Sequence, residues 1–180
     1  MGGINGQYTG GFEMTECVND GTITSTANNP VCLGGLSGSF NGMMTDCTNA
    51  GKVHYASTYV SGTAGKEPEI GGLAGYINAS MTGCQSKGEI VAGAGFAGGL
   101  AGGCGQDANG LLWKGTTVSC SISGDALKSA VVGRWRDEGT TVLSLGAEGE
   151  PVTISSQLAA FPLCAALKGN AIAEVNVVRE

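Results

Sequence analysis

Cysteine is the reactive residue type that this sequence uses most regularly. Four of its seven cysteines share one local context, in which a glycine follows four residues later. They are Cys17, Cys47, Cys84 and Cys120. Thiolates bind soft metals or form disulfides, so these are the two chemistries that such a set could perform. The odd count and the absence of any C-x-x-C pair do not fit a secreted disulfide scaffold. No role is assigned to Cys32, Cys104 or Cys164.

The candidates for acid–base chemistry are few. Glu16 and Asp46 occupy equivalent positions before two of these cysteines, and stacking would bring them about 5 Å apart, as in a retaining glycosidase. Gly83 and Ser119 stand at the next two equivalents, so we interpret the acidic pair as a solvated surface. His54 is the only histidine, and we expect it in a solvated loop. We predict no catalytic residue, no metal and no cofactor.

A repeated pattern positions these residues. It reads G-G-[IL]-x-G, a variable gap, M-T-x-C, three residues, then G-x-[IV], and its copies begin at Gly2, Gly34, Gly71 and Gly98. The fourth copy is degenerate, because it ends in T-V-S-C at Cys120 and carries an insertion over 104–114. Glycine is costly inside helices and helical periodicity is missing, so the repeats favour strands. Alternation along a strand predicts that Thr and Cys point inward and Met outward.

Short strands of this kind cannot bury their own apolar face, but stacked copies can. The sequence therefore predicts an all-β fold, a right-handed parallel β-helix (β-solenoid) of about four to five coils. In it the four cysteines form a ladder, which we interpret as packing by small apolar side chains. We assign 1–126 to the repeats and 127–180 to a last partial coil and a C-terminal β cap. The charges at Arg134, Arg136, Asp137 and Glu138 are expected on a solvated rim before the cap.

The pattern G-G-L-x-G followed by C-x-x-x-G-x-[IV] resembles the GLUG-motif repeats of bacterial cell-surface proteins. The resemblance covers about 2–126. It implies a β-solenoid in an extracellular or cell-surface setting, with a stalk or adhesive role, and it transfers no catalytic residue.

Composition narrows the possible partners. The net charge is −6, without a basic patch, so nucleic acid is not an expected partner. No run of 18 apolar residues could span a membrane. A signal peptide is not visible and the repeats begin directly after Met1, so we expect that a leader has been removed. We therefore predict an extracellular or cell-surface location.

The aromatic residues outside the repeated motifs offer a possible binding surface. Tyr55, Tyr59, Trp113 and Trp135 are expected in loops or insertions, where they could contact a ligand. The leading hypothesis is a non-enzymatic module that acts as an adhesin-like stalk or binding element for glycans or surface proteins. The alternative is a carbohydrate-active β-helix enzyme, either a polysaccharide lyase or a glycoside hydrolase.

Overall fold

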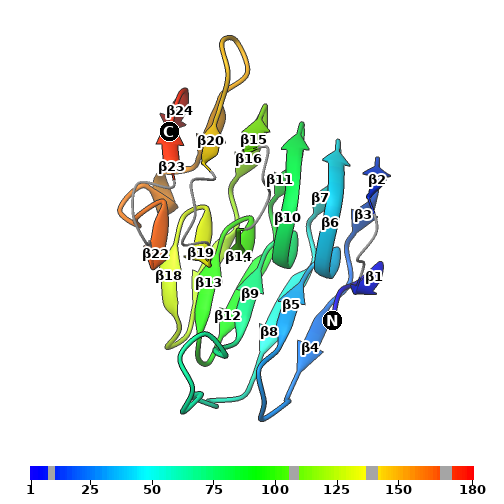
Figure 1. The fold of residues 1–180 in the computed structure, drawn as a ribbon, viewed down its shortest axis with the longest axis vertical. Helices are drawn as coiled ribbons and strands as arrows, with labels where there is room; N and C mark the ends of the chain where they lie inside the picture. Colours follow the sequence, from blue (N-terminus) through cyan, green and yellow to red (C-terminus); the bar gives the residue numbers. More distant parts are fainter. Residues whose placement is uncertain (8–10, 106–109, 137–141, 167–171) are drawn as a thin grey trace.

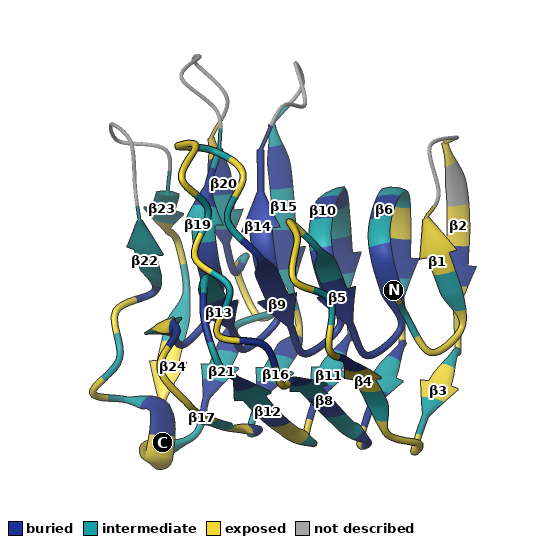
Figure 2. Ribbon diagram, turned by 90° about the horizontal axis from the view of Figure 1, so that it is seen from below, coloured by how far each residue is buried: buried dark blue, intermediate teal, exposed yellow. Residues whose placement is uncertain are grey.

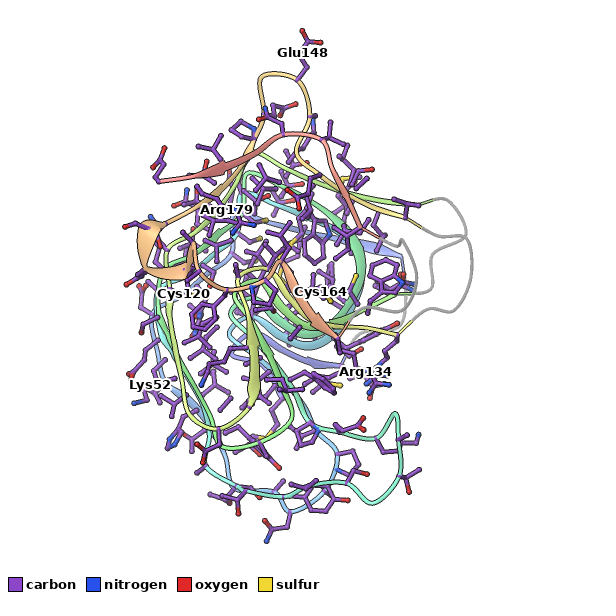
Figure 3. The ribbon with its side chains drawn as sticks, turned by 90° about the vertical axis from the view of Figure 1, so that its left-hand side faces the viewer. Lys52, Cys120, Arg134, Glu148, Cys164 and Arg179 are labelled. Atoms are coloured by element: carbon purple, nitrogen blue, oxygen red, sulfur yellow. The ribbon has the colours of Figure 1, made fainter. Side chains whose placement is uncertain are left out.

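The computed structural model describes residues 1–7, 11–105, 110–136, 142–166 and 172–180. Its strands pair in parallel and build four sheets, with one short 3₁₀ helix, η1 (Ser156–Leu158) (Figure 1). The prediction of an all-β fold with parallel sheets is confirmed. Figure 3 shows the ribbon curling around an interior that is filled with side chains.

Sheet B is the largest sheet and has ten strands. They are β1 (Asn5–Gln7), β2 (Phe12–Thr15), β6 (Ser37–Thr45), β10 (Ala74–Thr82), β14 (Ala101–Cys104), β15 (Leu111–Lys114), β19 (Val132–Trp135), β20 (Leu143–Leu145), β22 (Cys164–Ala166) and β23 (Ile172–Glu174). Sheet C has six strands, β3 (Val18–Asn19), β7 (Thr48–Asn49), β11 (Gln85–Ser86), β16 (Thr116–Val118), β21 (Val152–Ile154) and β24 (Val177–Arg179).

Two four-stranded sheets complete the fold. Sheet D holds β4 (Ile23–Ser25), β8 (Lys52–Tyr55), β12 (Glu89–Ala92) and β17 (Ser121–Ser123). Sheet A holds β5 (Cys32–Gly34), β9 (Glu69–Gly71), β13 (Phe96–Gly98) and β18 (Leu127–Ser129). From β5 onward the chain visits the sheets in the order A, B, C, D and then begins again at β9 and at β13. We call one such circuit through the four sheets a pass of the chain. Each pass places its strands beside the equivalent strands of the pass before.

The core consists of columns of equivalent residues. Leu36, Leu73, Leu100 and Val131 are fully buried, and the backbone nitrogen of each of the first three donates to the carbonyl of the next. In a second column Met44 pairs with Met81, which pairs with Trp113. Complete burial of such side chains stabilises the fold by about 1.5–3 kcal/mol each. Figure 2 shows that β9 and β14 are buried throughout, whereas β1 and β3 carry exposed positions.

The backbone at the corner between sheets B and C changes which side chains of the M-T-x-C motif point into the core. The residue before the cysteine has a left-handed backbone, with φ of 52° at Glu16, 51° at Asp46 and 66° at Gly83. A left-handed residue breaks the alternation of a strand, so the residues on its two sides no longer share the expected face. Met81 and Cys84 are both fully buried, and Thr82 between them is half-buried. The prediction of inward Thr and outward Met is wrong.

The glycine pairs of the motif are explained by close approach. A Cβ at Gly34 would lie 2.2 Å from the Ser37 carbonyl oxygen, and one at Gly35 would lie 2.2 Å from the Asn49 side chain. The first glycine therefore permits the tight turn that enters sheet B. The second leaves room for the buried side chain of Asn49 in sheet C.

The described strands of 127–180 continue the same sheets. Strand β18 pairs with β13, β19 with β14, and β21 with β16, and strands β22, β23 and β24 then form the outer edges of sheets B and C. The strands of this segment therefore occupy the columns that the repeats begin.

Candidate functional site

Three of the four aromatic candidates are core residues. Tyr55 ends β8, Trp113 lies in β15 and Trp135 ends β19, and none of these side chains is more than 1% exposed. The expectation that they lie in loops and face a ligand is wrong, because they fill the interior opposite smaller neighbours. The Trp113 Nε1 donates to the Ala79 carbonyl oxygen at 2.9 Å, and the Tyr55 hydroxyl donates to the Ala27 carbonyl oxygen at 2.9 Å. Only Tyr59 lies in a loop, half-buried.

The cysteine ladder has three thiols instead of four. The pairing of Val18 with Thr48 and of Thr48 with Gln85 places Cys17, Cys47 and Cys84 in register. Gln85 pairs with Thr117, so the next residue in this column is Thr116 and not Cys120. We call each residue position in the column a rung. Cys120 is fully buried beside Gly88, four residues out of the predicted register. The correction has a physical cause, because the left-handed corner of this pass is Gly115, with φ of 57°.

Thr116 reproduces the local chemistry of the thiols. Its Oγ1 donates to the Lys114 carbonyl oxygen at 3.0 Å, two residues earlier. The Sγ atoms of Cys47 and Cys84 make the same contact with the carbonyl oxygens of Thr45 and Thr82, at 3.2 Å and 3.4 Å. The signal that could have identified Thr116 is the sequence W-K-G-T, whose glycine matches that of M-T-G-C at Gly83.

The acid–base candidates do not form a site. Glu16 and Asp46 are exposed at their left-handed corners. His54 lies within β8, half-buried, and not in the loop that we expected. Among the described residues, no cluster of three or more His, Cys, Asp or Glu side chains could hold a metal ion. No described helix is long and apolar enough to cross a membrane.

A groove beside the non-repeating loop 56–68 is the best candidate site. Its volume is about 430 Å³, and the loop forms one side, with the turns before β13 and β18 on the other. The lining residues are Thr58, Val60, Glu67, Gly93, Ala94, Gly95, Phe96, Asp125 and Leu127. Val60 is 78% exposed and Leu127 is 58% exposed. This groove therefore offers apolar surface to solvent, with two carboxylates among its lining residues.

Both ends of the loop are fixed. At its start the Ser57 hydroxyl donates to the Asn28 Oδ1 at 2.6 Å, and the Tyr59 backbone nitrogen donates to the Ser57 hydroxyl at 3.1 Å. At its end Glu67 accepts from Arg134 Nη1 at 2.6 Å and from the Gly65 nitrogen at 3.0 Å. The groove wall is therefore held in place by contacts at both ends.

Arg134 also contacts Phe96, one of the residues that line the groove. Its guanidinium lies over the Phe96 ring, 5.4 Å from the ring centre. A cation above an aromatic face is stabilising, more so when both groups are partly shielded from water. Figure 3 labels Arg134 at the margin of the side-chain-filled interior.

A second ion pair anchors the strand that follows the loop. Glu69 is fully buried and accepts from Arg136 Nε and Nη2, at 2.6 Å and 2.7 Å. Burial raises the pKa of Glu69, although the hydrogen bonds and charge of Arg136 oppose the rise. Desolvation lowers the pKa of Arg136, but the hydrogen bonds that it donates to Glu69 and the charge of that carboxylate raise it overall. The Arg136 guanidinium also stacks on Tyr76, 4.6 Å from the ring centre.

The two arginines correct the expectation of a solvated rim. Arg134 and Arg136 are paired with buried or half-buried carboxylates, whereas Asp137 and Glu138 lie outside the described residues. The sequence holds a usable signal, because E-P-E and R-W-R have the same two-residue spacing between like charges.

Comparison with known proteins gives no relative. No protein-family model, curated protein or solved structure matches the chain significantly.

Proposed function

We propose that this chain is a non-enzymatic module of a bacterial secreted or cell-surface protein, and that its fold is a right-handed parallel β-helix. The recurring order of sheets A, B, C and D and the in-register columns support this fold. The resemblance to GLUG-motif repeats supports the location. In this proposal the stacked strands form a stiff stalk, and the non-repeating parts bind partners.

The groove beside loop 56–68 is the binding site in this proposal, and its ligand is a neutral glycan. The observation that carries it is the exposed apolar surface that faces the groove from both sides, Val60 on a loop held at both ends and Leu127 at the start of β18. Apolar surface of this kind contacts the C–H faces of sugar rings. The carboxylates of Glu67 and Asp125 accept hydrogen bonds from sugar hydroxyls. The net charge of −6 disfavours acidic glycans.

A glycan-array screen of the full chain tests the site. We expect binding to neutral glycans and none to sialylated or uronic acid-containing ones. The double variant Val60→Ser, Leu127→Ser should lose this binding, whereas Val175→Ser, a control at an exposed valine outside the groove lining, should keep it. Equal binding by the double variant and the wild type would rule out the groove.

A polysaccharide-degradation assay tests the non-enzymatic role separately. We expect no shortening of the glycans that bind and none of plant or bacterial polysaccharides. Turnover of any polymer would contradict the proposal and support a carbohydrate-active enzyme.

A further inference from the structure

We propose that Cys47 and Cys84 form a two-coordinate site for a soft monovalent cation, Cu(I). The inference is independent of the proposed function, because it concerns the interior at the corner between sheets B and C. It begins from the register, which places Cys17, Cys47 and Cys84 on successive rungs. Cys47 and Cys84 are both fully buried, and all seven cysteines are free thiols.

The two thiols have the same orientation. The Cys47 Sγ lies 3.2 Å from the Thr45 carbonyl oxygen and 3.3 Å from that of Met14. The Cys84 Sγ repeats these contacts one rung further, 3.4 Å from the Thr82 carbonyl oxygen and 3.5 Å from that of Met44. Equivalent contacts fix equivalent side-chain directions. The spacing of the sulfurs therefore follows the spacing of the strands.

That spacing suits linear coordination. Neighbouring strands lie about 4.8 Å apart. A metal–thiolate bond is about 2.3 Å long, so an ion midway between two sulfurs spans about 4.6 Å. Parallel side chains at this distance are less suited to a disulfide, which needs Cβ atoms about 3.8 Å apart. A single ion cannot reach all three thiols, because the outer two are two strand spacings apart.

The chemistry of the surroundings favours a soft ion. Thiolates and thioethers select Cu(I), and Met44 and Met81 are fully buried in the same core. Packing alone does not require sulfur in this column, because Thr116 and Val152 occupy its next two rungs and are also fully buried. Sulfur is thus concentrated in one stretch of a column that accepts other side chains.

Entry of the ion is provided by Cys17. It is half-buried directly before β3, an edge strand of sheet C, and lies beside Cys47. An ion captured there can pass to Cys47 by exchange of one thiolate for another. On binding, Cys47 and Cys84 each release one proton to solvent as their Cu–S bonds form, and no electron is transferred.

Anaerobic titration of the reduced full chain with Cu(I), in competition with the chelator bicinchoninate, tests the site. We expect one equivalent to bind tightly, with thiolate-to-copper charge-transfer absorption and two sulfur neighbours in X-ray absorption. Cys84→Thr should fold, because Thr116 fills the same column, and should weaken binding by about 100-fold or more. Cys47→Ser should do the same.

Cys120→Ser is the matched control, because Cys120 is also a fully buried thiol but lies outside the ladder. It should bind copper like the wild type. Weak binding of several equivalents that does not depend on Cys47 and Cys84 would mean an adventitious ion only and would overturn the proposal. Equal affinity of Cys84→Thr and the wild type would also overturn it.

Discussion

The Glu69 carboxylate accepts two hydrogen bonds from Arg136, which lies 67 residues further along the chain. Glu69 is completely buried, whereas a third of the Arg136 side chain is exposed. A buried charge is tolerated only while its partner is present, so loss of one partner costs more than loss of both. The pair ties β9 to the end of β19, two passes of the chain later.

Arg136→Ala tests this relationship. The substitution leaves Glu69 buried without its partner, and we expect the free energy of unfolding to fall by about 3–5 kcal/mol in urea denaturation. The double variant Glu69→Gln, Arg136→Met should recover more than half of the loss. Lys52→Ala serves as the control, since it removes an exposed ion pair with Glu89 and should cost less than about 1 kcal/mol. Equal losses in the two single variants would contradict the role of burial.

Gly88→Ala probes the close stacking of the rungs. A Cβ at this position would lie 1.8 Å from the Gly51 carbonyl oxygen, so we expect a loss of about 3 kcal/mol or more, measured by thermal or urea unfolding. Gly62→Ala is the matched control, because its Cβ would meet no atom within 4 Å. A tolerated Gly88→Ala would mean that the rungs are further apart than described.

Alkaline pH should destabilise the fold through Cys120. Burial raises the pKa of the Cys120 thiol from 9.0 to about 11. The folded chain then holds this proton more tightly than the unfolded chain, which contributes about 3 kcal/mol below pH 9 that is lost as pH rises toward 11.

Urea unfolding of the wild type and Cys120→Ala at about pH 8 and about pH 10.5 measures this contribution. The stability difference between the two proteins should be smaller at the higher pH by about 2 kcal/mol. Other groups titrate alike in both proteins. A difference that does not change with pH would show that the Cys120 thiol does not contribute in this way.

Thr116 provides a test of the corrected register. Thr116→Val removes the hydroxyl that donates to the Lys114 carbonyl oxygen and should cost about 1 kcal/mol. Thr116→Cys restores the side chain of the preceding rungs and should change the stability by less than that. If Cys120 occupied the column instead of Thr116, Thr116→Val would not lose more stability than Thr116→Cys. Chemical denaturation of both proteins decides the outcome.

Much of the fold was predictable because the chain repeats a pattern. Columns such as Leu36, Leu73 and Leu100 follow directly from aligned copies of one motif, and parallel pairing follows from stacking them. The composition of Ile172 to Val178 predicts one strand, but a bend at Val175 and Asn176 divides it into β23 of sheet B and β24 of sheet C. Patterns of this kind depend on neighbouring residues, which a single sequence displays.

The facing of Met and the place of Cys120 depend on backbone geometry instead. Glu16 and Asp46 adopt a left-handed conformation that their residue types do not predict. The alternation of inward and outward side chains was therefore assumed to continue across a corner where it fails. The fourth copy was then aligned on Gly124, although Gly115 holds the corner. The ion pairs of Arg134 with Glu67 and of Arg136 with Glu69 were missed for a different reason. The partners are 67 residues apart, and only the stacking of successive passes brings them together.

The candidate groove could be anticipated only in part. Loop 56–68 breaks the repeat, which marks it as a place for recognition, and Tyr59 lies in it. The opposite side comes from the turns at Gly95 and Asp125, and only the stacking of passes brings these to the loop.

The direction of the hydrogen bonds between strands has a mechanical consequence. They run from each pass of the chain to the next, so a force that separates the first pass from the last loads them one rung at a time. Such a chain should lengthen in steps under load, each releasing roughly one repeat, about 30 residues. The Glu69–Arg136 pair joins strands of different passes, and it should act as a lock that delays one of those steps. Optical-tweezers extension of the wild type and Arg136→Ala would show whether that step disappears.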